Sequence, residues 1–342
     1  MNYKKVLITK YGGPEVLRVV DENELPKPQK GEVRIKTLAT SACFTDTMIR
    51  KGIYYGVKQK PPFAPGYDIV GVVDELGEGV THLQVGQRIA ELTVTGAYSE
   101  YLCIPAVNCV PVPETVEASE AVSMVLTYMT AYQMLHRIAK VKRGARILVH
   151  GASGAVGTAL IQLGALHGLE IYGTASAKSG ELVSSLGAIH IDYQTEDFVH
   201  RIESLDPKGV DVVFDAIGGA NFKRSFQCLR NGGILVAYGS YNSAIGKEGS
   251  AMLSYTALMI RSSLTPGKSA SIYSIVPFKE KHPDWFADDL KELMHLLEQG
   301  KIKPVISKKL SLTDAAKAHQ LLEARGVNGK IVLLANELSS IN

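Results

Sequence analysis

The sequence has few cysteines, and none of them lie in a closely paired motif. Four occur in 342 residues, and no C-x-x-C is present. They are Cys43, Cys103, Cys109 and Cys228. This spacing excludes a disulfide framework and a zinc ribbon. It indicates reduced thiols, and we therefore expect a cytoplasmic protein.

An excess of charge of either sign is also missing. Lys and Arg together number 37 and Asp and Glu number 34, which gives a net charge of +3. So small a balance gives no indication of a nucleic-acid partner. The opening residues, MNYKKVLITKYGG, lack the apolar core of a secretory signal, so we expect no export.

A long uninterrupted apolar run is missing as well. Residues 147–169 carry no charge, but Gly151, Gly154 and Gly157 divide them into a short strand and a helix. That helix of about 13 residues spans roughly 20 Å, whereas a membrane requires ~30 Å. The sequence therefore predicts no membrane span.

The middle of the chain alternates apolar runs with helix-like segments. This pattern predicts an α/β fold in which crossover helices join a parallel sheet. The expected strands are 146–150, 170–175, 189–192, 210–216, 234–239 and 271–276. The expected helices are 156–167, 180–186, 197–205 and 222–229. Six such strands make a complete doubly wound, dinucleotide-binding Rossmann sheet.

The two ends of the chain have a different pattern. Short alternating strands such as 32–38 and 69–76, interrupted by Gly and Pro, predict an antiparallel, barrel-like β domain. Helices are expected at 284–299 and 313–325, and a last strand at 329–334. This tail has no phosphate loop of its own, so we assign it to the first domain. The predicted domains are residues 1–125 with 278–342, and residues 126–277.

A glycine-rich turn is the clearest chemical feature. In 146-RILVHGASGAVGTALIQL-163 a β-branched strand leads through three glycines into an apolar helix. Glycines let a pyrophosphate approach the backbone, and the helix N-terminus favours its charge. The G-x-x-G-x-x-G spacing alone is a weak signal, and the alternative is a connection without a ligand.

The end of the second strand predicts which dinucleotide binds. NAD sites usually place an Asp or Glu there for the ribose 2′-hydroxyl. Here 172-YGTASAKSGE-181 offers Ser176 and Lys178 instead, with Glu181 inside the next helix. We therefore expect NADPH rather than NADH. The alternative for Lys178 is a solvated lysine at a helix start.

Motifs along almost the whole chain resemble a known family. They are KYGGPEVL, PGYDIVGVVDELGEGV, VGQRI, TAY, GASGAVG, IDYQTEDF, DAIGG, AYGS and GKIVLL, in that order. The chain resembles the zinc-free branch of the medium-chain dehydrogenase/reductases, which includes zeta-crystallin-type quinone oxidoreductases and the vesicle amine transport protein group. The resemblance implies a Rossmann domain and a discontinuous GroES-like β-barrel domain. It also implies a homodimer.

The resemblance assigns cofactor contacts to particular positions. The phosphate loop corresponds to Ser153, Gly154, Ala155, Val156 and Gly157. The surroundings of the 2′-phosphate correspond to Ser176, Lys178 and Tyr193. Gly218, Gly239 and Ser240 correspond to positions along the nicotinamide half. We also predict cofactor contacts for Thr127 and Lys330.

The zinc ligands of related alcohol dehydrogenases are incomplete here. Those enzymes have C-H-T-D and G-H-E, whereas this chain has 43-CFTD-46 and 66-GYD-68. Tyr67 replaces the histidine, and a catalytic zinc needs three protein ligands. We therefore predict no metal and interpret Cys43 as a thiol near the pocket, where relatives often have Asn. Asp46 and Asp68 are interpreted as loop-holding residues.

Without a Lewis acid, an acceptor that delocalises negative charge is favoured. Quinones and α,β-unsaturated carbonyls are such acceptors, so we expect one of them as the small-molecule substrate. Tyr54 matches a cleft tyrosine of the family, and its phenol can donate to the developing oxyanion. The alternative is a tyrosine that only packs the barrel. Tyr54 and Cys43 are the candidate catalytic residues.

Other functions stay open from the sequence alone. One is a zinc-type alcohol dehydrogenase with degenerate ligands. The other is a weakly catalytic cofactor-binding protein that acts through lipid or partner binding. Which quinone or enone is the physiological substrate is not predicted, because its site is expected in loops around Tyr54, Thr127 and residues 241–259. A sixth strand at 271–276, without an obvious covering helix, adds an edge at which two copies can pair.

Overall fold

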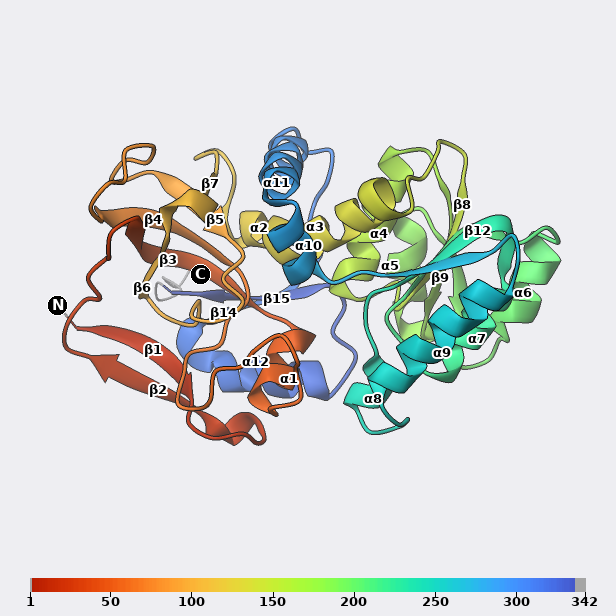
Figure 1. The fold of residues 1–342 in the computed structure, drawn as a ribbon, viewed down its shortest axis with the longest axis horizontal. Helices are drawn as coiled ribbons and strands as arrows, with labels where there is room; N and C mark the ends of the chain where they lie inside the picture. The colour runs from red at the N-terminus through yellow and green to blue at the C-terminus, as the bar shows by residue number, and fades with distance from the viewer. Residues whose placement is uncertain (1, 336–342) are drawn as a thin grey trace. The chain divides into compact units, whose positions relative to one another are not determined.

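The computed structural model describes residues 2–335 of the chain (Figure 1). The chain divides into two compact units. One consists of Met1–Met129 and His282–Asn342, and the other of Thr130–Lys281. These bounds lie four residues from those expected from the sequence.

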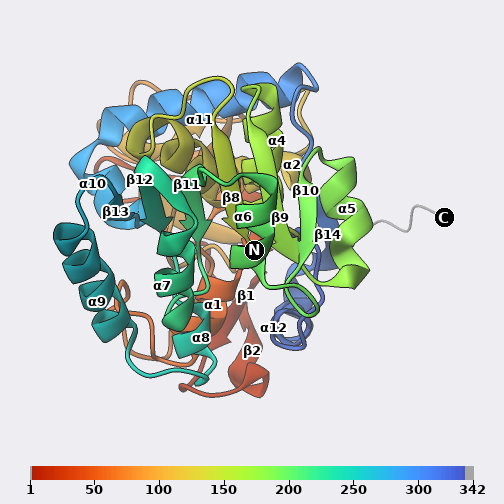
Figure 2. The same ribbon diagram turned by 90° about the vertical axis from the view of Figure 1, so that its right-hand side faces the viewer.

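The Thr130–Lys281 unit contains a 6-stranded sheet with the order β10-β9-β8-β11-β12-β13. The strands are β8 (Arg146–His150), β9 (Glu170–Ala175), β10 (Ile189–Asp192), β11 (Val210–Asp215), β12 (Leu229–Ala237) and β13 (Ser269–Ile272). Every pairing is parallel. Figure 2 shows them from β13 on the left to β10 on the right. The order reverses between β8 and β11, which confirms the expected doubly wound, Rossmann-type sheet.

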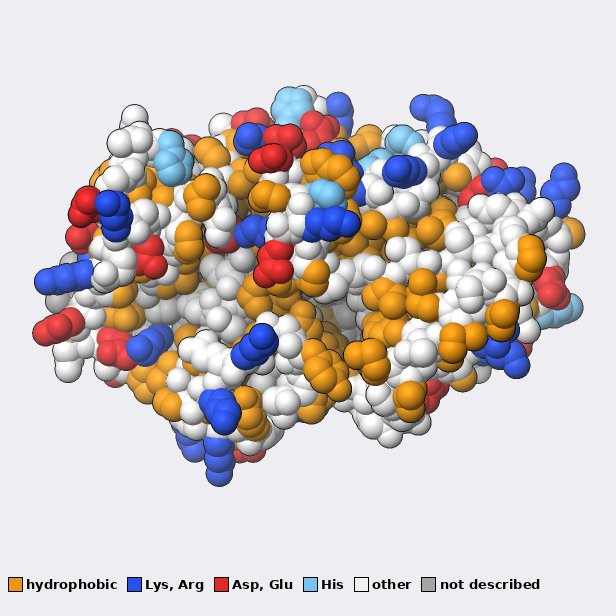
Figure 3. Space-filling model, viewed as in Figure 1, with side chains coloured by type: hydrophobic (Ala, Val, Ile, Leu, Met, Phe, Trp, Pro, Cys, Tyr) orange, Lys and Arg blue, Asp and Glu red, His pale blue; other side chains and the backbone are white. Residues whose placement is uncertain are grey.

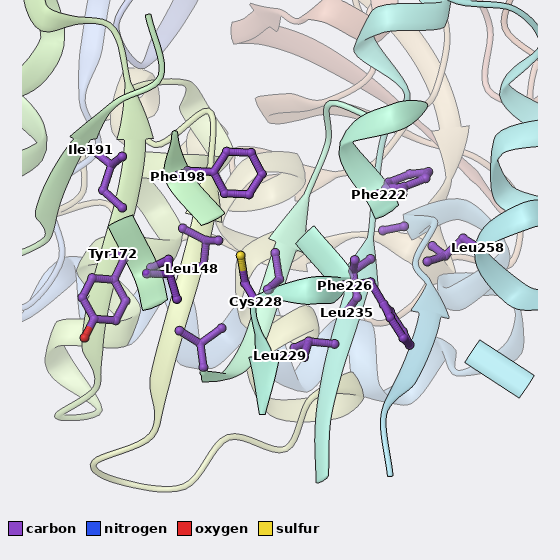
Figure 4. Close-up of a cluster of buried hydrophobic side chains, with 14 residues drawn as sticks. Leu148, Tyr172, Ile191, Phe198, Phe222, Phe226, Cys228, Leu229, Leu235 and Leu258 are labelled. Carbon is purple, nitrogen blue, oxygen red and sulfur yellow. The ribbon is translucent and has the colours of Figure 1, made fainter. Parts of the chain in front are cut away.

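Helices pack against both faces of this sheet. A Cβ at Gly164 of α4 (Ala155–Leu166) would contact Ile147 and Ile171, so α4 lies on their face. Successive strand residues point to opposite faces, so the side chain of Leu148 lies on the sheet face opposite to that of Ile147 and α4. There it joins a buried cluster (Figure 4). Its other members include residues of α6 (Phe198–Leu205), α7 (Ala220–Gln227) and α9 (Ala251–Leu264).

The other unit is built mainly on a 7-stranded sheet with the order β14-β15-β3-β4-β5-β7, in which β6 also pairs with β3. Its strands are β3 (Glu32–Ala42), β4 (Ile69–Leu76), β5 (Arg88–Glu91), β6 (Tyr101–Pro105), β7 (Val110–Pro111), β14 (Ile306–Ser311) and β15 (Lys330–Leu334). β1 (Tyr3–Ile8) and β2 (Leu17–Glu22) form a separate pair. β15 runs antiparallel to β3, with Ile331 opposite Ala42. The late segment thus completes a sheet begun early in the chain.

The remaining helices are short, except for one. Those of the first unit include α1 (Phe44–Arg50), α2 (Ala118–Ser123), α11 (Pro283–Glu298) and α12 (Ala315–Glu323), and α3 (Met129–Tyr132) begins at its boundary. Those of the Rossmann-type unit include α5 (Gly180–Ser185), α8 (Tyr241–Ala244) and α10 (Ile275–Lys281).

No helix within residues 2–335 has the length and apolar character to span a membrane. On the face in Figure 3, basic and acidic side chains are interspersed rather than gathered by sign.

Three sequence expectations were wrong in detail. The sixth strand is 269–272, not 271–276, because Ile275 and Val276 begin α10. The segment 241–259 is largely helical, and α9 packs against β13, so this strand does have a neighbouring helix. β14 was not expected and pairs in parallel with β15, so the sheet is not wholly antiparallel.

Candidate active site

The glycine-rich turn joins β8 to α4. Gly151 has φ of +65°, in the left-handed region that favours glycine. A Cβ at Gly157 would collide with the carbonyl oxygen of Gly151. Gly154 precedes α4 without a side-chain cap, and the first turn carries no acid. The predicted loop residues follow one another here: Ser153, Gly154, Ala155, Val156 and Gly157. The turn therefore fits a pyrophosphate, with first-turn N–H groups remaining as donors.

Three predicted cofactor residues come together beyond β9 and β10. Asp192 lies opposite Ala175 in these neighbouring strands. The backbone N–H of Tyr193 donates to the carbonyl of Ala175 at 3.3 Å, and Ser176 is the first residue after β9. Lys178 lies exposed in the following turn and makes no ion pair with the described part of the chain. Its charge is therefore uncompensated, as binding of a 2′-phosphate requires.

The predicted nicotinamide-side residues lie at the exits of β11 and β12. Asp215 and Ala237 are paired in these strands, close to Gly218, Gly239 and Ser240. Gly218 has φ of +80°, and a Cβ there would lie 2.7 Å from the Ser240 hydroxyl. The two segments therefore pack directly against each other, and only glycine fits at the contact.

All of these residues follow the carboxyl ends of the parallel strands. The sheet order reverses between β8 and β11. In open α/β sheets, ligands bind beyond the carboxyl ends of the strands at such a reversal. The unit thus has the geometry of a dinucleotide site.

In the unit of residues 2–129 and 282–335, the partly buried Cys43 and the buried Asp46 form a pair at the start of α1. The Cys43 thiol and backbone N–H donate to Asp46 Oδ2 at 3.0 and 2.9 Å. Burial, reinforced by the Asp46 carboxylate, raises the pKa of the Cys43 thiol well above its usual value. Burial also raises the pKa of Asp46 to about 6. Asp46 Oδ1 has no hydrogen-bond partner among the described residues. The thiol is therefore a protonated donor in this structure.

Thr127 and Lys330, both predicted as cofactor contacts, bind each other. The Lys330 ammonium donates to Thr127 Oγ1 at 2.8 Å and to Asp68 Oδ2 at 3.1 Å. Asp68 also accepts from the backbone and hydroxyl of Ser41 at 2.9 and 2.6 Å. An ammonium has three hydrogens, so Lys330 keeps one for a further acceptor. Asp68 holds separate segments together, as expected.

Tyr54 meets Tyr67, the residue at the position of the family's zinc-binding histidine. Their hydroxyl oxygens lie 2.8 Å apart, and the rings cross edge to face at 78° with centroids 6.2 Å apart. Tyr67 is 1% exposed, whereas Tyr54 is half-buried. Burial raises the pKa of both phenols. Both are therefore neutral donors at ordinary pH.

Within residues 2–335, no group of three or more His, Cys, Asp and Glu side chains is arranged to hold a metal ion. Cys43 binds Asp46, and Tyr67 binds Tyr54.

A buried network at the Rossmann sheet was not predicted. The Ser225 hydroxyl donates to Asp215 at 2.6 Å and lies 3.0 Å from His150 Nε2. Asp215 also accepts from the backbone N–H groups of Ile217 and Gly218 at 2.7 and 3.2 Å. The aspartate thus shapes the turn that contains Gly218. The sequence offered two signals for it: the place of Asp215 at the end of an apolar run and its position as the first residue of the DAIGG motif.

Fold and site together define a class of protein: a Rossmann-type dinucleotide unit combined with a GroES-like β unit. Residues 29–114 match the family described as alcohol dehydrogenase GroES-like domain, and residues 186–333 match the family described as zinc-binding dehydrogenase.

Individual relatives narrow the class. The chain is 31% identical to quinone oxidoreductase of Rattus norvegicus over 338 residues, 97% of each protein. It is 30% identical to the synaptic vesicle membrane protein VAT-1 homolog of Danio rerio, covering 97% of this chain and 70% of the relative. Among solved structures, Escherichia coli quinone oxidoreductase complexed with NADPH superposes with a TM-score of 0.85 at 27% identity, covering 97% of this chain and 99% of that one. This protein therefore belongs to the medium-chain dehydrogenase/reductase family, with quinone oxidoreductases and VAT-1 homologues among its relatives.

Proposed function

We propose that this protein reduces quinones, or the C=C bond of α,β-unsaturated carbonyls, with NADPH and without a metal ion. Bound NADPH supplies a hydride. The protein's own residues hold the cofactor, place the acceptor and stabilise the negative charge that develops on its oxygen.

The observation that carries the choice of cofactor is the exposed, unpaired Lys178 beyond β9. No acidic side chain occupies the position at which NAD sites hold the ribose 2′-hydroxyl. Ser176 and Tyr193 flank the same exit of the sheet. This arrangement supports NADPH over NADH.

The choice of acceptor follows from the donors that are available. Cys43 and Tyr54 are neutral, because their pKa values are raised by burial. A neutral hydroxyl stabilises an oxyanion less than a Lewis-acid metal does. A conjugated acceptor spreads its charge over several atoms, so it makes the smaller demand on Tyr54. Isolated ketones and saturated alcohols do not have this advantage.

The test is a turnover screen with saturating NADPH. Quinones, alkenals and enones should be reduced, whereas isolated ketones should not be reduced and simple alcohols should not be oxidised with NADP⁺. Efficient alcohol oxidation would favour the alcohol dehydrogenase alternative. Turnover of no conjugated acceptor would favour a binding protein that acts through a lipid or a partner.

Metal analysis tests the same proposal independently. The purified protein should hold well under one zinc ion per chain, and chelators should leave its activity unchanged. Stoichiometric zinc that is lost on substitution of Cys43 would contradict the metal-free reaction.

We also propose that two copies associate through β13, the edge strand of the Rossmann-type sheet. β13 is the last strand of this sheet, and Ile272 is 45% exposed there. The Ala270 N–H donates to the Ser262 hydroxyl of α9, so a second strand would pair beside Ile272. Sedimentation should show a dimer, and Ile272→Lys should weaken it, because it places a charge on the exposed side of this strand. A monomer at all concentrations would contradict this assembly.

A further inference from the structure

Tyr54 and Tyr67 reach each other from different segments. Tyr54 follows α1 after a short turn, and Tyr67 lies two residues before β4. The Tyr54 ring passes so close to Gly56 that a Cβ there would lie 2.6 Å from its Cε1 atom. The glycine therefore leaves room for the ring, and the edge-to-face crossing brings the two hydroxyls together.

Burial decides which hydroxyl donates. A phenol has one hydrogen to give and can also accept. Tyr67 is 1% exposed, and the only partner of its hydroxyl within the described chain is the Tyr54 hydroxyl. If Tyr54 were the donor, the Tyr67 hydrogen would be buried without an acceptor, which is costly. Tyr67 therefore donates to Tyr54.

This direction leaves the hydrogen of Tyr54 uncommitted. Its hydroxyl has no other partner among the described residues, and the side chain is only half-buried. A hydroxyl that accepts one hydrogen bond is polarised and becomes a stronger donor in the next. Tyr54 is thus a half-buried neutral donor whose oxygen accepts the hydrogen bond from Tyr67.

We propose that Tyr67 is a positioning residue, which directs the hydrogen of Tyr54 toward the carbonyl oxygen of a conjugated acceptor. The proposal rests on the proposed function, because that function supplies the oxygen on which charge develops. Tyr67 acts only through Tyr54 and does not touch the substrate. The position thus holds a hydrogen-bond donor where zinc relatives have a metal ligand.

A double-mutant cycle tests the dependence of one tyrosine on the other. Tyr54→Phe should lower kcat/KM for enone or quinone reduction by about tenfold to a hundredfold. Tyr67→Phe should lower it by about threefold to tenfold in the wild-type background and have no further effect in the Tyr54→Phe background. Tyr55→Phe, an adjacent substitution at an 84% exposed side chain, is the matched control and should change nothing.

Two results would overturn the proposal in an active enzyme. In the first, Tyr67→Phe leaves kcat/KM unchanged. In the second, Tyr67→Phe lowers kcat/KM by the same factor in the Tyr54→Phe background as in the wild-type background. The second result would show that Tyr67 contributes through packing alone. Inactivity of the wild-type protein toward every conjugated acceptor would instead contradict the proposed function.

A measurement without turnover tests the hydrogen bond itself. In protein labelled with ¹³Cζ-tyrosine, the Tyr54 resonance should titrate at lower pH than that of Tyr67, because a donor stabilises the Tyr54 phenolate. Tyr67→Phe should move the Tyr54 midpoint upward, and Tyr55→Phe should not. An unchanged Tyr54 midpoint in Tyr67→Phe would overturn the proposal whether or not a substrate is known.

Discussion

Lys330 and Asp68 form a buried ion pair across 262 residues of sequence, with Nζ and Oδ2 3.1 Å apart. Their side chains are 3% and 0% exposed. Lys330 begins β15, and Asp68 directly precedes β4. Because the same ammonium also binds Thr127, it ties three distant segments of one unit together.

Removing this lysine should destabilise the fold. Lys330→Met leaves the Asp68 carboxylate buried without its cation, a loss of about 3–5 kcal/mol in the free energy of unfolding. Denaturant unfolding measures it. Lys309→Met is the control, because Lys309 pairs with Glu117 at the surface and such pairs contribute about 0–1 kcal/mol. If Lys330→Met lowered the free energy of unfolding by no more than Lys309→Met does, the structural role of the buried ion pair would be contradicted.

Cofactor preference should depend on Lys178. We expect NADPH to bind at least about tenfold tighter than NADH, which corresponds to ~1.4 kcal/mol. Lys178→Ala should remove most of that preference by weakening NADPH alone. Lys142→Ala, also at an exposed lysine but before β8 rather than beyond β9, should have no effect. Equal affinity of the wild-type protein for both cofactors, measured by titration, would refute the assignment.

The phosphate loop is tested at Gly154. Gly154→Asp should abolish NADPH binding while the protein stays folded, because a carboxylate would stand where the pyrophosphate approaches α4. Gly154→Ala separates charge from size: its Cβ would lie 3.3 Å from the Gly151 carbonyl oxygen, so a partial loss is expected. Calorimetric titration measures both variants. Unaltered affinity in a folded Gly154→Asp protein would make the turn a mere connection.

His319 should make stability depend on pH. Its Nδ1 accepts from Arg50 at 3.2 Å, so in the neutral ring Nε2 carries the hydrogen, 3.1 Å from the Tyr98 hydroxyl. Burial and the Arg50 charge lower its pKa from 6.5 to about 3. The unfolded chain therefore binds a proton that the folded chain does not, and stability falls as pH drops from 6.5 toward 3.

The expected loss approaches ~1.4 kcal/mol per pH unit in that window. His319→Gln removes the titrating ring, so unfolding free energies of this variant should vary less steeply with pH than those of the wild-type protein. Parallel pH profiles for the two proteins would contradict the buried neutral histidine.

Local patterns in the sequence account for most of the Rossmann-type unit. The strands β8 to β11 are apolar runs bounded by turn residues, and each begins at the expected residue. Residues 271–276, SIYSIV, were wrongly predicted as a strand because their β-branched residues favour strands, whereas a helix begins at Ile275 in the structure. Pro277 is compatible with that helix because it lies in the first turn, where its missing N–H needs no partner. β14 was missed because ISKKLS is mostly polar and gains its pairing only from β15.

In the candidate site too, features formed by residues adjacent in sequence were open to prediction, and contacts between distant segments were not. The glycine turn and Lys178 could be predicted because their chemistry follows from residues adjacent in sequence. The contact between Tyr54 and Tyr67, and the ion pair of Lys330, depend on how separate segments pack. No local periodicity carries that information. The donor direction between the two tyrosines follows only once the burial of each is known.

The most direct test of the central claim is transfer of label from the cofactor to an enone. NADPH deuterated at the transferring C4 position is incubated with the protein and a conjugated enone, and the product is examined by mass spectrometry and NMR. The account predicts a saturated ketone with one deuterium on the former β-carbon, formed without added metal and in the presence of a chelator. Deuterium on the carbonyl carbon of an allylic alcohol would contradict it. So would the failure of every enone to give a labelled product together with the failure of every quinone to be reduced.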